Sequence, residues 1–170
     1  MLSENNNQNN QHYRKMRRKD RLMPVEKSNE LLEKGEYGIL STVGEDGQPY
    51  ATPLSYIVID NDIYFHCAAE GQKLDNITFE PRVCFCVVGK TQPIYDKGFT
   101  NYFESVIVYG KAEKINDKDK KIEILMKLAE KYLIEHIDKA KSDIERSINV
   151  TLIYKISIEH ITGKEKAKTN

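Results

Sequence analysis

The feature that most constrains the fold is a series of β-type runs joined by short turns. Residues 50–60 (YATPLSYIVID) and 63–68 (IYFHCA) are rich in β-branched and aromatic residues, and only Asn61 and Asp62 separate them. Such a pair between two β-type runs predicts a tight hairpin. Further runs of this kind cover residues 37–43, 82–89, 102–115 and 148–164. We therefore expect six strands in a largely antiparallel sheet, which closes into a barrel or meets a second chain because open edges favour aggregation.

Helical patterns surround these runs. A short helix is expected after Pro24 and before Gly35, because proline suits a first turn and glycine a helix end. A second is expected over residues 70–80, an amphipathic one over 117–133, and another over roughly 135–146. Residues 90–101 are expected to form a loop. The predicted fold class is mainly β, with peripheral helices.

The chain is expected to form one domain over residues 16–166, between an N-terminal tail (1–15) and a C-terminal tail (167–170). The first residues are rich in asparagine and glutamine, and such segments bury too little apolar surface to order. A basic cluster, RKMRRKDR, follows at residues 14–21. It is a solvated lead-in, a site for nucleic acid, or a source of arginines, Arg17 or Arg18, that neutralise a phosphate bound elsewhere on the domain; the neutral whole chain favours the lead-in over nucleic acid.

Composition narrows the class of protein. Lysine plus arginine and aspartate plus glutamate number 26 each among the 170 residues, which argues against nucleic acid as the main partner. No apolar run is long enough to span a membrane, and three cysteines do not suit a disulfide framework. These features predict a cytoplasmic protein without a membrane partner.

The stretch between residues 63 and 77, IYFHCAAEGQKLDNI, joins a strand to a helix. Helix N-termini present unpaired N–H groups and partial positive charge, which accept phosphate. Gly71 allows close backbone approach there, and Lys73 adds a full charge. The plain alternative is a strand-to-helix corner with a surface lysine. His66 points away from its neighbours Phe65 and Cys67, and a lone strand histidine is more often a satisfied or exposed residue than a catalyst.

A metal site is not expected. His66 and Cys67 face opposite sides of a strand, while Cys84 and Cys86 are about 6.6 Å apart along one. Zinc thiolates need sulfur atoms roughly 3.8 Å apart. The cysteines are interpreted as small buried hydrophobic residues.

Four blocks together resemble the pyridoxamine 5′-phosphate oxidase-related family, closest to the branch of 5-nitroimidazole-resistance proteins. They are MRRKDRLMP, residues 35–77, ESVIVYGKAEKI and ISIEHITGK, within residues 16–166. The resemblance implies a six-stranded split β-barrel of the FMN-binding type, a homodimer, FMN in a cleft between subunits, and a small-molecule substrate. The chain lacks an evident match to the substrate-phosphate set of true pyridoxamine-phosphate oxidases, so oxidation of vitamin B6 is not expected.

The same resemblance implies roles for individual residues. His66 is the catalytic candidate, and Lys73 is the phosphate-binding cation. The implied cofactor-binding residues are Pro53, Leu54, Ser55, Tyr56, His66, Cys67, Ala68, Gly71, Gln72, Lys73, Glu104, Ser105 and Val106, the last three from the second subunit or the same one.

Three functions stay open. The first is an FMN-dependent oxidoreductase that passes electrons from a reduced nicotinamide to a small oxidant such as a nitroaromatic. The second is a non-enzymatic flavin-binding module. The third is a haem-binding split-barrel protein, with His66 as the axial ligand.

Overall fold

The computed structural model describes residues 13–95 and 98–167. Most of the expected N-terminal tail, residues 1–12, lies outside the described residues, as do residues 168–170 of the C-terminal tail. The helices are η1 (Lys19–Arg21), α1 (Val25–Lys34), α2 (Gln72–Phe79), α3 (Lys118–Tyr132), η2 (Ile134–His136) and α4 (Ile137–Ser147). The strands are β1 (Gly38–Val43), β2 (Pro49–Leu54), β3 (Ile57–Ile59), β4 (Asp62–Cys67), β5 (Arg82–Tyr95), β6 (Phe99–Ile115) and β7 (Leu152–Lys166).

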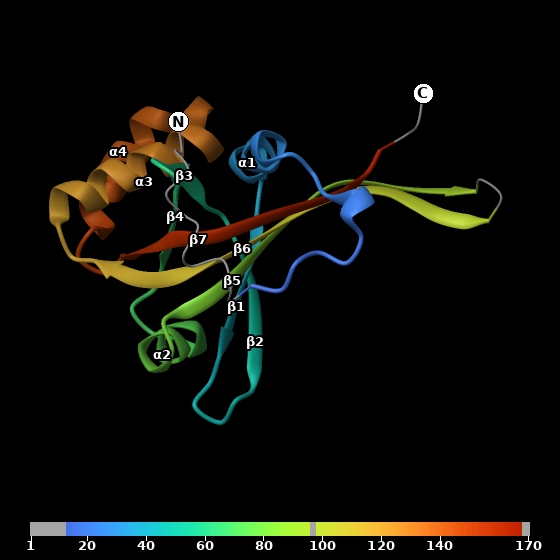
Figure 1. Cartoon of the computed structure of the whole chain (residues 1–170). Coiled ribbons are helices and arrows are strands. Elements are labelled where there is room, and N and C mark those ends of the chain that lie inside the picture. The colour runs from blue at the N-terminus through green and yellow to red at the C-terminus, as the bar shows by residue number, and fades with distance from the viewer. Residues whose placement is uncertain (1–12, 96–97, 168–170) are drawn as a thin grey trace.

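The strands form one antiparallel sheet in the order β2-β1-β5-β6-β7-β4-β3 (Figure 1). β2 and β3 lie at opposite edges of this order, yet only Ser55 and Tyr56 separate them along the chain. The two edges must therefore lie close together, and the sheet is curled into a half-barrel. The mainly β, antiparallel split-barrel prediction is confirmed, with seven strands because the expected run 50–60 divides in two.

The concave side of the sheet holds the main hydrophobic core. Leu40, Phe65, Phe85, Val108 and Ile156 are completely buried there. They come from five different strands, and on β1, β5 and β6 the buried residues alternate with more exposed neighbours, as one-sided burial of a strand requires. Burial of this side holds the half-barrel closed.

A second hydrophobic cluster joins α3 and α4 to the other side of β3 and β4. Ile124 and Leu128 of α3 pack with Ile144 of α4 against Tyr64 and Ile153. Apolar residues three and four apart line one face of each helix, which matches the amphipathic pattern in the sequence. The main core covers one side of β4, and α3 and α4 cover the other side as far as Tyr64. His66 lies past the end of these helices and is exposed.

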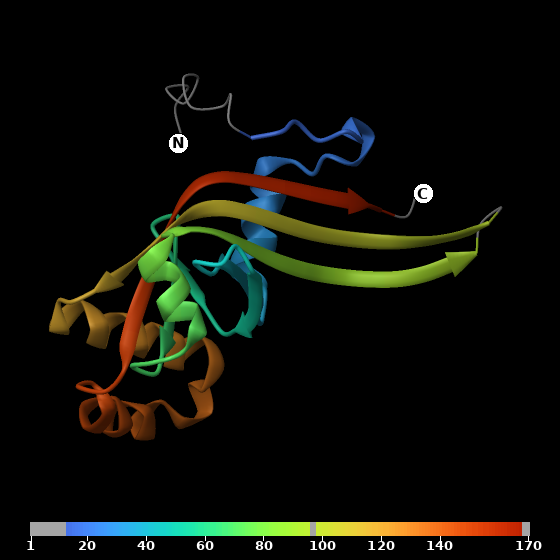
Figure 2. The same cartoon turned by 90° about the horizontal axis from the view of Figure 1, so that it is seen from below.

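The hairpin of β5 and β6 extends well beyond the rest of the sheet (Figure 2). Pairing continues past a bulge between Val88 and Thr91 as far as Tyr95 and Phe99. The expected loop over 90–101 is therefore wrong as far as the described residues go. Most of these residues are exposed on both sides, so no alternation of apolar and polar residues marks them as strands.

Candidate functional site

The hairpin of β3 and β4 carries His66 to one end of the sheet. The turn consists of Asp60 and Asn61, with φ of 51° and 65°, and Ile59 pairs with Asp62. Positive φ at both positions is the conformation of the two-residue hairpin turn that asparagine and aspartate tolerate. The reversal is one residue earlier than the sequence suggested. The register places His66 opposite Ile153 of β7.

Gly71 ends the connection from β4 and begins α2. Its φ of 137° is one that residues with a side chain rarely adopt, and a Cβ built there would meet no heavy atom within 4 Å. The Gly71 carbonyl accepts from Leu74 N at 2.8 Å, so the N–H groups of Gln72 and Lys73 precede the first intrahelical bond. Within the described residues, no side chain caps this helix. N–H groups in the first turn of a helix lack intrahelical partners, so this end can accept an anion.

Contacts on the far side of α2 fix the direction of this end. Leu74 and Ile77 are buried in the main core. The buried Asn76 donates from Nδ2 to Thr42 Oγ1 at 2.9 Å, which ties the helix to β1. Because three side chains hold α2, its N-terminus cannot turn without breaking core contacts.

A cavity of about 560 Å³ opens beside this corner. This volume lies within the range found for ligand pockets, roughly 300–1,000 Å³. The lining includes three residues expected from the sequence, His66, Cys67 and Ala68. Val150 and Thr151, from the turn between α4 and β7, line it too. Sequence reasoning missed these two because only the pairing of β4 with β7 brings them there.

The His66 side chain remains accessible to solvent, but its pKa is lowered from the ordinary value. Partial burial is the larger cause and the positive charge of Lys73 is the second. The imidazole is therefore mainly neutral at pH 7, with one nitrogen donating and the other accepting.

Burial raises the pKa of the Cys67 thiol, although Lys73 and then Lys114 oppose the shift. Burial also raises the pKa of Cys84 and Cys86. All three are free thiols that stay protonated and are poor nucleophiles. In residues 13–95 and 98–167, no three His, Cys, Asp or Glu side chains form a group that could hold a metal ion.

Residues 53–56 lie at the seam where the sheet edges meet. The side chains of Pro53 and Ser55 are exposed, and that of Leu54 is partly buried. Tyr56 differs from the expectation: its ring is completely buried, and its N–H and carbonyl bond to Tyr132 Oη at 3.0 and 2.8 Å. Tyr56 thus has a structural role, and the groups that face outward here belong to residues 53–55.

Residues 104–106 lie far from His66 within one chain. Ser105 pairs with Lys164 and His66 with Ile153, so their partners are eleven positions apart on β7, about 36 Å of strand. Glu104 Oε1 accepts from Lys90 N at 3.1 Å, where it supports the bulge in β5. Val106 is completely buried in the core, so its side chain is not available to a ligand. Ser105 is the member of this set that faces outward.

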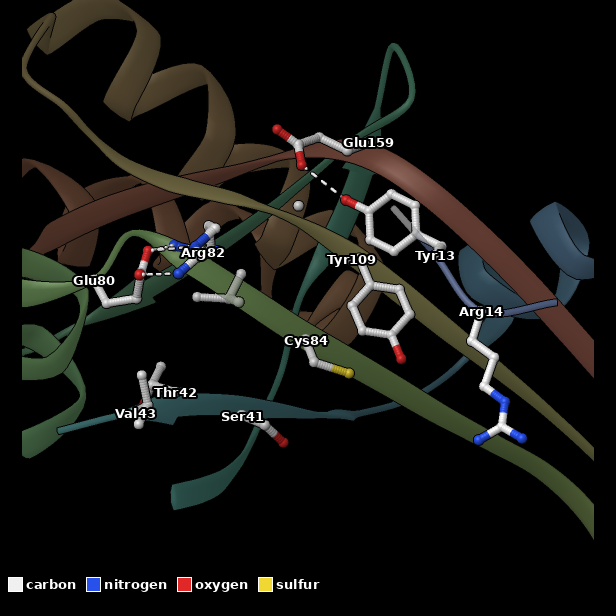
Figure 3. A pocket seen from close by; sticks show the side chains of 12 residues that line it. Tyr13, Arg14, Ser41, Thr42, Val43, Glu80, Arg82, Cys84, Tyr109 and Glu159 are labelled. Carbon is white, nitrogen blue, oxygen red and sulfur yellow. Dashed lines mark hydrogen bonds and ion pairs between the residues drawn. The ribbon is translucent and has the colours of Figure 1, made fainter. Parts of the chain in front are cut away.

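A second cavity, of about 480 Å³, lies on the convex side of the sheet (Figure 3). Tyr13 stacks on His160 at 4.6 Å and on Tyr109 at 5.0 Å, and its hydroxyl donates to Glu159 at 2.9 Å. Burial, followed by the Glu159 contact, raises the pKa of Tyr13. The remaining lining residues are Arg14, Ser41, Thr42, Val43, Glu80, Arg82, Val83, Cys84 and Gly110.

Three of the four charged groups that line the second cavity, Glu80, Arg82 and Glu159, are already paired. Arg82 donates to both carboxylate oxygens of Glu80, at 2.9 and 2.5 Å, and lowers the pKa of that carboxyl to about 2. The sequence did not single out this region, because its residues come from five separate segments. The first cavity is the better candidate for a ligand, because it lies beside the start of α2 and Lys73, although the Glu70 carboxylate also lines it.

Comparisons with known proteins agree with this architecture. A family model described as pyridoxamine 5′-phosphate oxidase matches residues 24–165. No curated protein gives a significant match. A solved structure of a conserved hypothetical protein from Mycobacterium tuberculosis has a TM-score of 0.76 and 23% identity, covering 92% of this chain and 96% of that one.

Two other solved structures carry functional descriptions. An FAD and haem binding protein from Mycobacterium smegmatis has a TM-score of 0.74 and 16% identity, covering 85% of this chain and 72% of that one. A candidate 5-nitroimidazole antibiotic resistance protein from Bacteroides thetaiotaomicron has a TM-score of 0.72 and 18% identity, covering 84% and 85%. At these identities the likeness establishes the split-barrel fold.

Proposed function

The chain belongs to the pyridoxamine 5′-phosphate oxidase family, and on that basis we propose that it binds FMN at the corner between β4 and α2. The observation that carries this proposal is the open N-terminus of α2. The N–H groups of Gln72 and Lys73 precede the first intrahelical bond, and the Lys73 ammonium lies close enough to His66 and Cys67 to shift their pKa values. A phosphate there would meet backbone donors, the helix dipole and a full positive charge.

The isoalloxazine ring would extend from this corner toward Pro53 and Ser55. The β3–β4 ladder ends with Ile57 opposite Tyr64, so Ser55 and His66 both continue from that end of the ladder. Small side chains at Ala68 and Ala69 leave room beside the imidazole. These residues fit a flat ring whose polar edge meets exposed backbone, as the resemblance implies.

The complete site is proposed to need a second copy of the chain. Ser105 cannot reach a ligand held at Lys73 of its own chain, since about 36 Å of β7 separates the two regions. The convex side around Ser105 carries the partly exposed Ile39, Cys86 and Ile107, which pair across β1, β5 and β6. An uncharged row of this kind suits a two-fold interface. Ser105 of one chain would then face the flavin of the other.

Bound FMN would supply two-electron transfer, and the proposed reaction passes electrons from a reduced nicotinamide to a small oxidant such as a nitroaromatic. The role of this chain is to hold the cofactor and to orient the oxidant. The lowered pKa of His66 favours a neutral imidazole, which can donate one N–H hydrogen bond to a nitro or carbonyl oxygen. His66 is therefore proposed to orient the substrate and to pass protons, rather than to store one at pH 7.

The visible absorption spectrum of the purified protein tests the proposal. A flavin band that bleaches on anaerobic addition of reduced nicotinamide would support a reductase. A flavin band that does not bleach would contradict the reductase, and a non-enzymatic flavin-binding module would be the remaining function. Purified protein that carries no flavin and takes up none from added FMN would contradict the whole proposal.

Haem is a second candidate for the same cavity, because His66 is neutral and accessible there. A neutral imidazole nitrogen is the form that ligates haem iron. A protein from Mycobacterium smegmatis with a similar fold is described as FAD and haem binding, which supports haem as a candidate here. A haem spectrum that disappears in His66→Ala would favour this candidate over the flavin.

A further inference from the structure

The short connection between β2 and β3 is the seam of the half-barrel, and a side-chain clamp from α3 holds it. Ser55 and Tyr56 leave one sheet edge and enter the other, so Tyr56 has no strand partner on either side. Its backbone groups need other partners, because an unpaired buried amide costs about 1–3 kcal/mol. Those partners are Lys131 and Tyr132, about 75 residues later in the chain.

Lys131 joins three backbone carbonyls. Its Nζ donates to Gly35 O at 2.8 Å, to Glu33 O at 3.1 Å and to Tyr56 O at 3.1 Å. An ammonium group has three donors, so these contacts use them all. Two of the acceptors belong to the end of α1, where the helix dipole favours a cation. The ammonium also lies 4.4 Å from the centre of the Tyr56 ring and 5.3 Å from that of Tyr132.

Tyr132 completes the clamp. Its hydroxyl accepts from Tyr56 N at 3.0 Å and donates to Tyr56 O at 2.8 Å. One phenol therefore makes both backbone hydrogen bonds that a neighbouring strand would otherwise provide. The Tyr56 hydroxyl donates in turn to Leu32 O of α1. Partial burial lowers the pKa of Lys131 and raises that of Tyr132, as expected for groups enclosed by protein. Helices α1 and α3 thus fix both the ring and the backbone of one residue.

We propose that Lys131 and Tyr132 are positioning residues for the cofactor, acting through Tyr56 on the adjacent backbone of Pro53, Leu54 and Ser55. This inference rests on the proposed function, in which that backbone meets the flavin ring. The clamp does not touch the ligand. It sets where the two sheet edges meet, and therefore the position of the groups beside His66.

The test compares Lys131→Met and Tyr132→Phe with Lys127→Met, a matched control. Lys127 is an exposed lysine one helical turn earlier on α3. Each apo-protein is titrated with FMN, the visible spectrum of each complex is recorded, and folding is checked by circular dichroism. We expect at least a tenfold weaker Kd and a shifted flavin band in the first two variants. We expect wild-type values in the control, and partial recovery in Lys131→Arg.

A purely structural role would lower the melting temperature but leave the Kd and spectrum of the folded protein unchanged. Folded Lys131→Met with wild-type Kd and spectrum would overturn the inference. If that variant does not fold, Tyr132→Phe decides in the same way, because it keeps the ring and loses both hydrogen bonds. Wild-type protein that binds no FMN would instead overturn the proposed function, so the two failures are distinguishable.

Discussion

Replacing Lys73 with alanine should weaken FMN binding by about 10- to 150-fold. Lys73 is the second residue of α2, and its charge reaches the cavity, where it lowers the pKa of both His66 and Cys67. A hydrogen bond between charged partners is worth about 1.5–3 kcal/mol. Each 1.4 kcal/mol changes an affinity about tenfold, which gives the stated range. The backbone donors of Gln72 and Lys73 remain in the variant, so binding should weaken and not disappear.

The assay is a titration of apo-protein with FMN and, separately, with riboflavin, which has the same ring but no phosphate. Lys73→Ala should lose affinity for FMN and keep its affinity for riboflavin. Lys127→Ala, which removes an exposed lysine from α3, should change neither. Equal losses for the two flavins, or no loss for FMN, would refute the assignment of the phosphate to this helix end.

A second measurement needs no flavin. Because the charge of Lys73 lowers the pKa of His66, the alanine variant should titrate at a higher pH, measured by NMR of the imidazole. Burial is the larger cause and persists, so the pKa should stay below its ordinary value. An unchanged His66 pKa would show that the Lys73 ammonium does not act on the cavity.

Three further predictions concern stability and assembly. Val106→Ala removes buried methyl groups from a completely buried side chain and should cost about 2–3 kcal/mol of unfolding free energy in urea, while Val88→Ala, at an exposed position, should cost under about 0.5 kcal/mol. Ile107→Glu places a charge on the convex side and should convert dimers to monomers in sedimentation and weaken FMN binding, whereas Lys127→Glu should do neither. The pKa values of His66 and His160 are lowered in the folded state, so the unfolded chain takes up protons first as the pH falls below about 6.5. The melting temperature should therefore fall when the pH is lowered from 7 to 5, and it should fall less in His66→Gln. An equal fall in the two proteins would contradict the lowered pKa of His66 in the folded state.

The sequence predicts those parts of the fold that depend on neighbouring residues. The β3–β4 hairpin, α1 between Pro24 and Gly35, and the amphipathic α3 all follow from local turn chemistry and periodicity. The division of residues 50–60 into β2 and β3 does not, because the partners of Tyr56 lie on α3. Nothing in the sequence around Ser55 indicates that the next residue, Tyr56, is hydrogen-bonded to Tyr132.

The same distinction separates the parts of the candidate site. His66, Ala68, Gly71 and Lys73 lie within one short stretch, so a strand followed by a helix is enough to bring them together. Val150 and Thr151 reach the cavity only through the register of β4 against β7. Glu104, with its carboxylate in the β5 bulge, shows the opposite case. The family resemblance suggests a ligand contact there, while the structure shows a backbone hydrogen bond.

Two regions of the convex side of the sheet explain why one chain is expected to hold only part of its cofactor site. Over β3 and β4, helices α3 and α4 cover the sheet and fix the seam through Lys131. The convex side around Ile107 keeps uncharged side chains partly exposed, and the contacts of Tyr13 with Tyr109 and His160 lie farther along it. Under the proposed function, a ligand at Lys73 is anchored by its own chain. The convex side of a second copy, with the outward-facing Ser105 and the uncharged row of Ile39, Cys86 and Ile107, is proposed to enclose its ring.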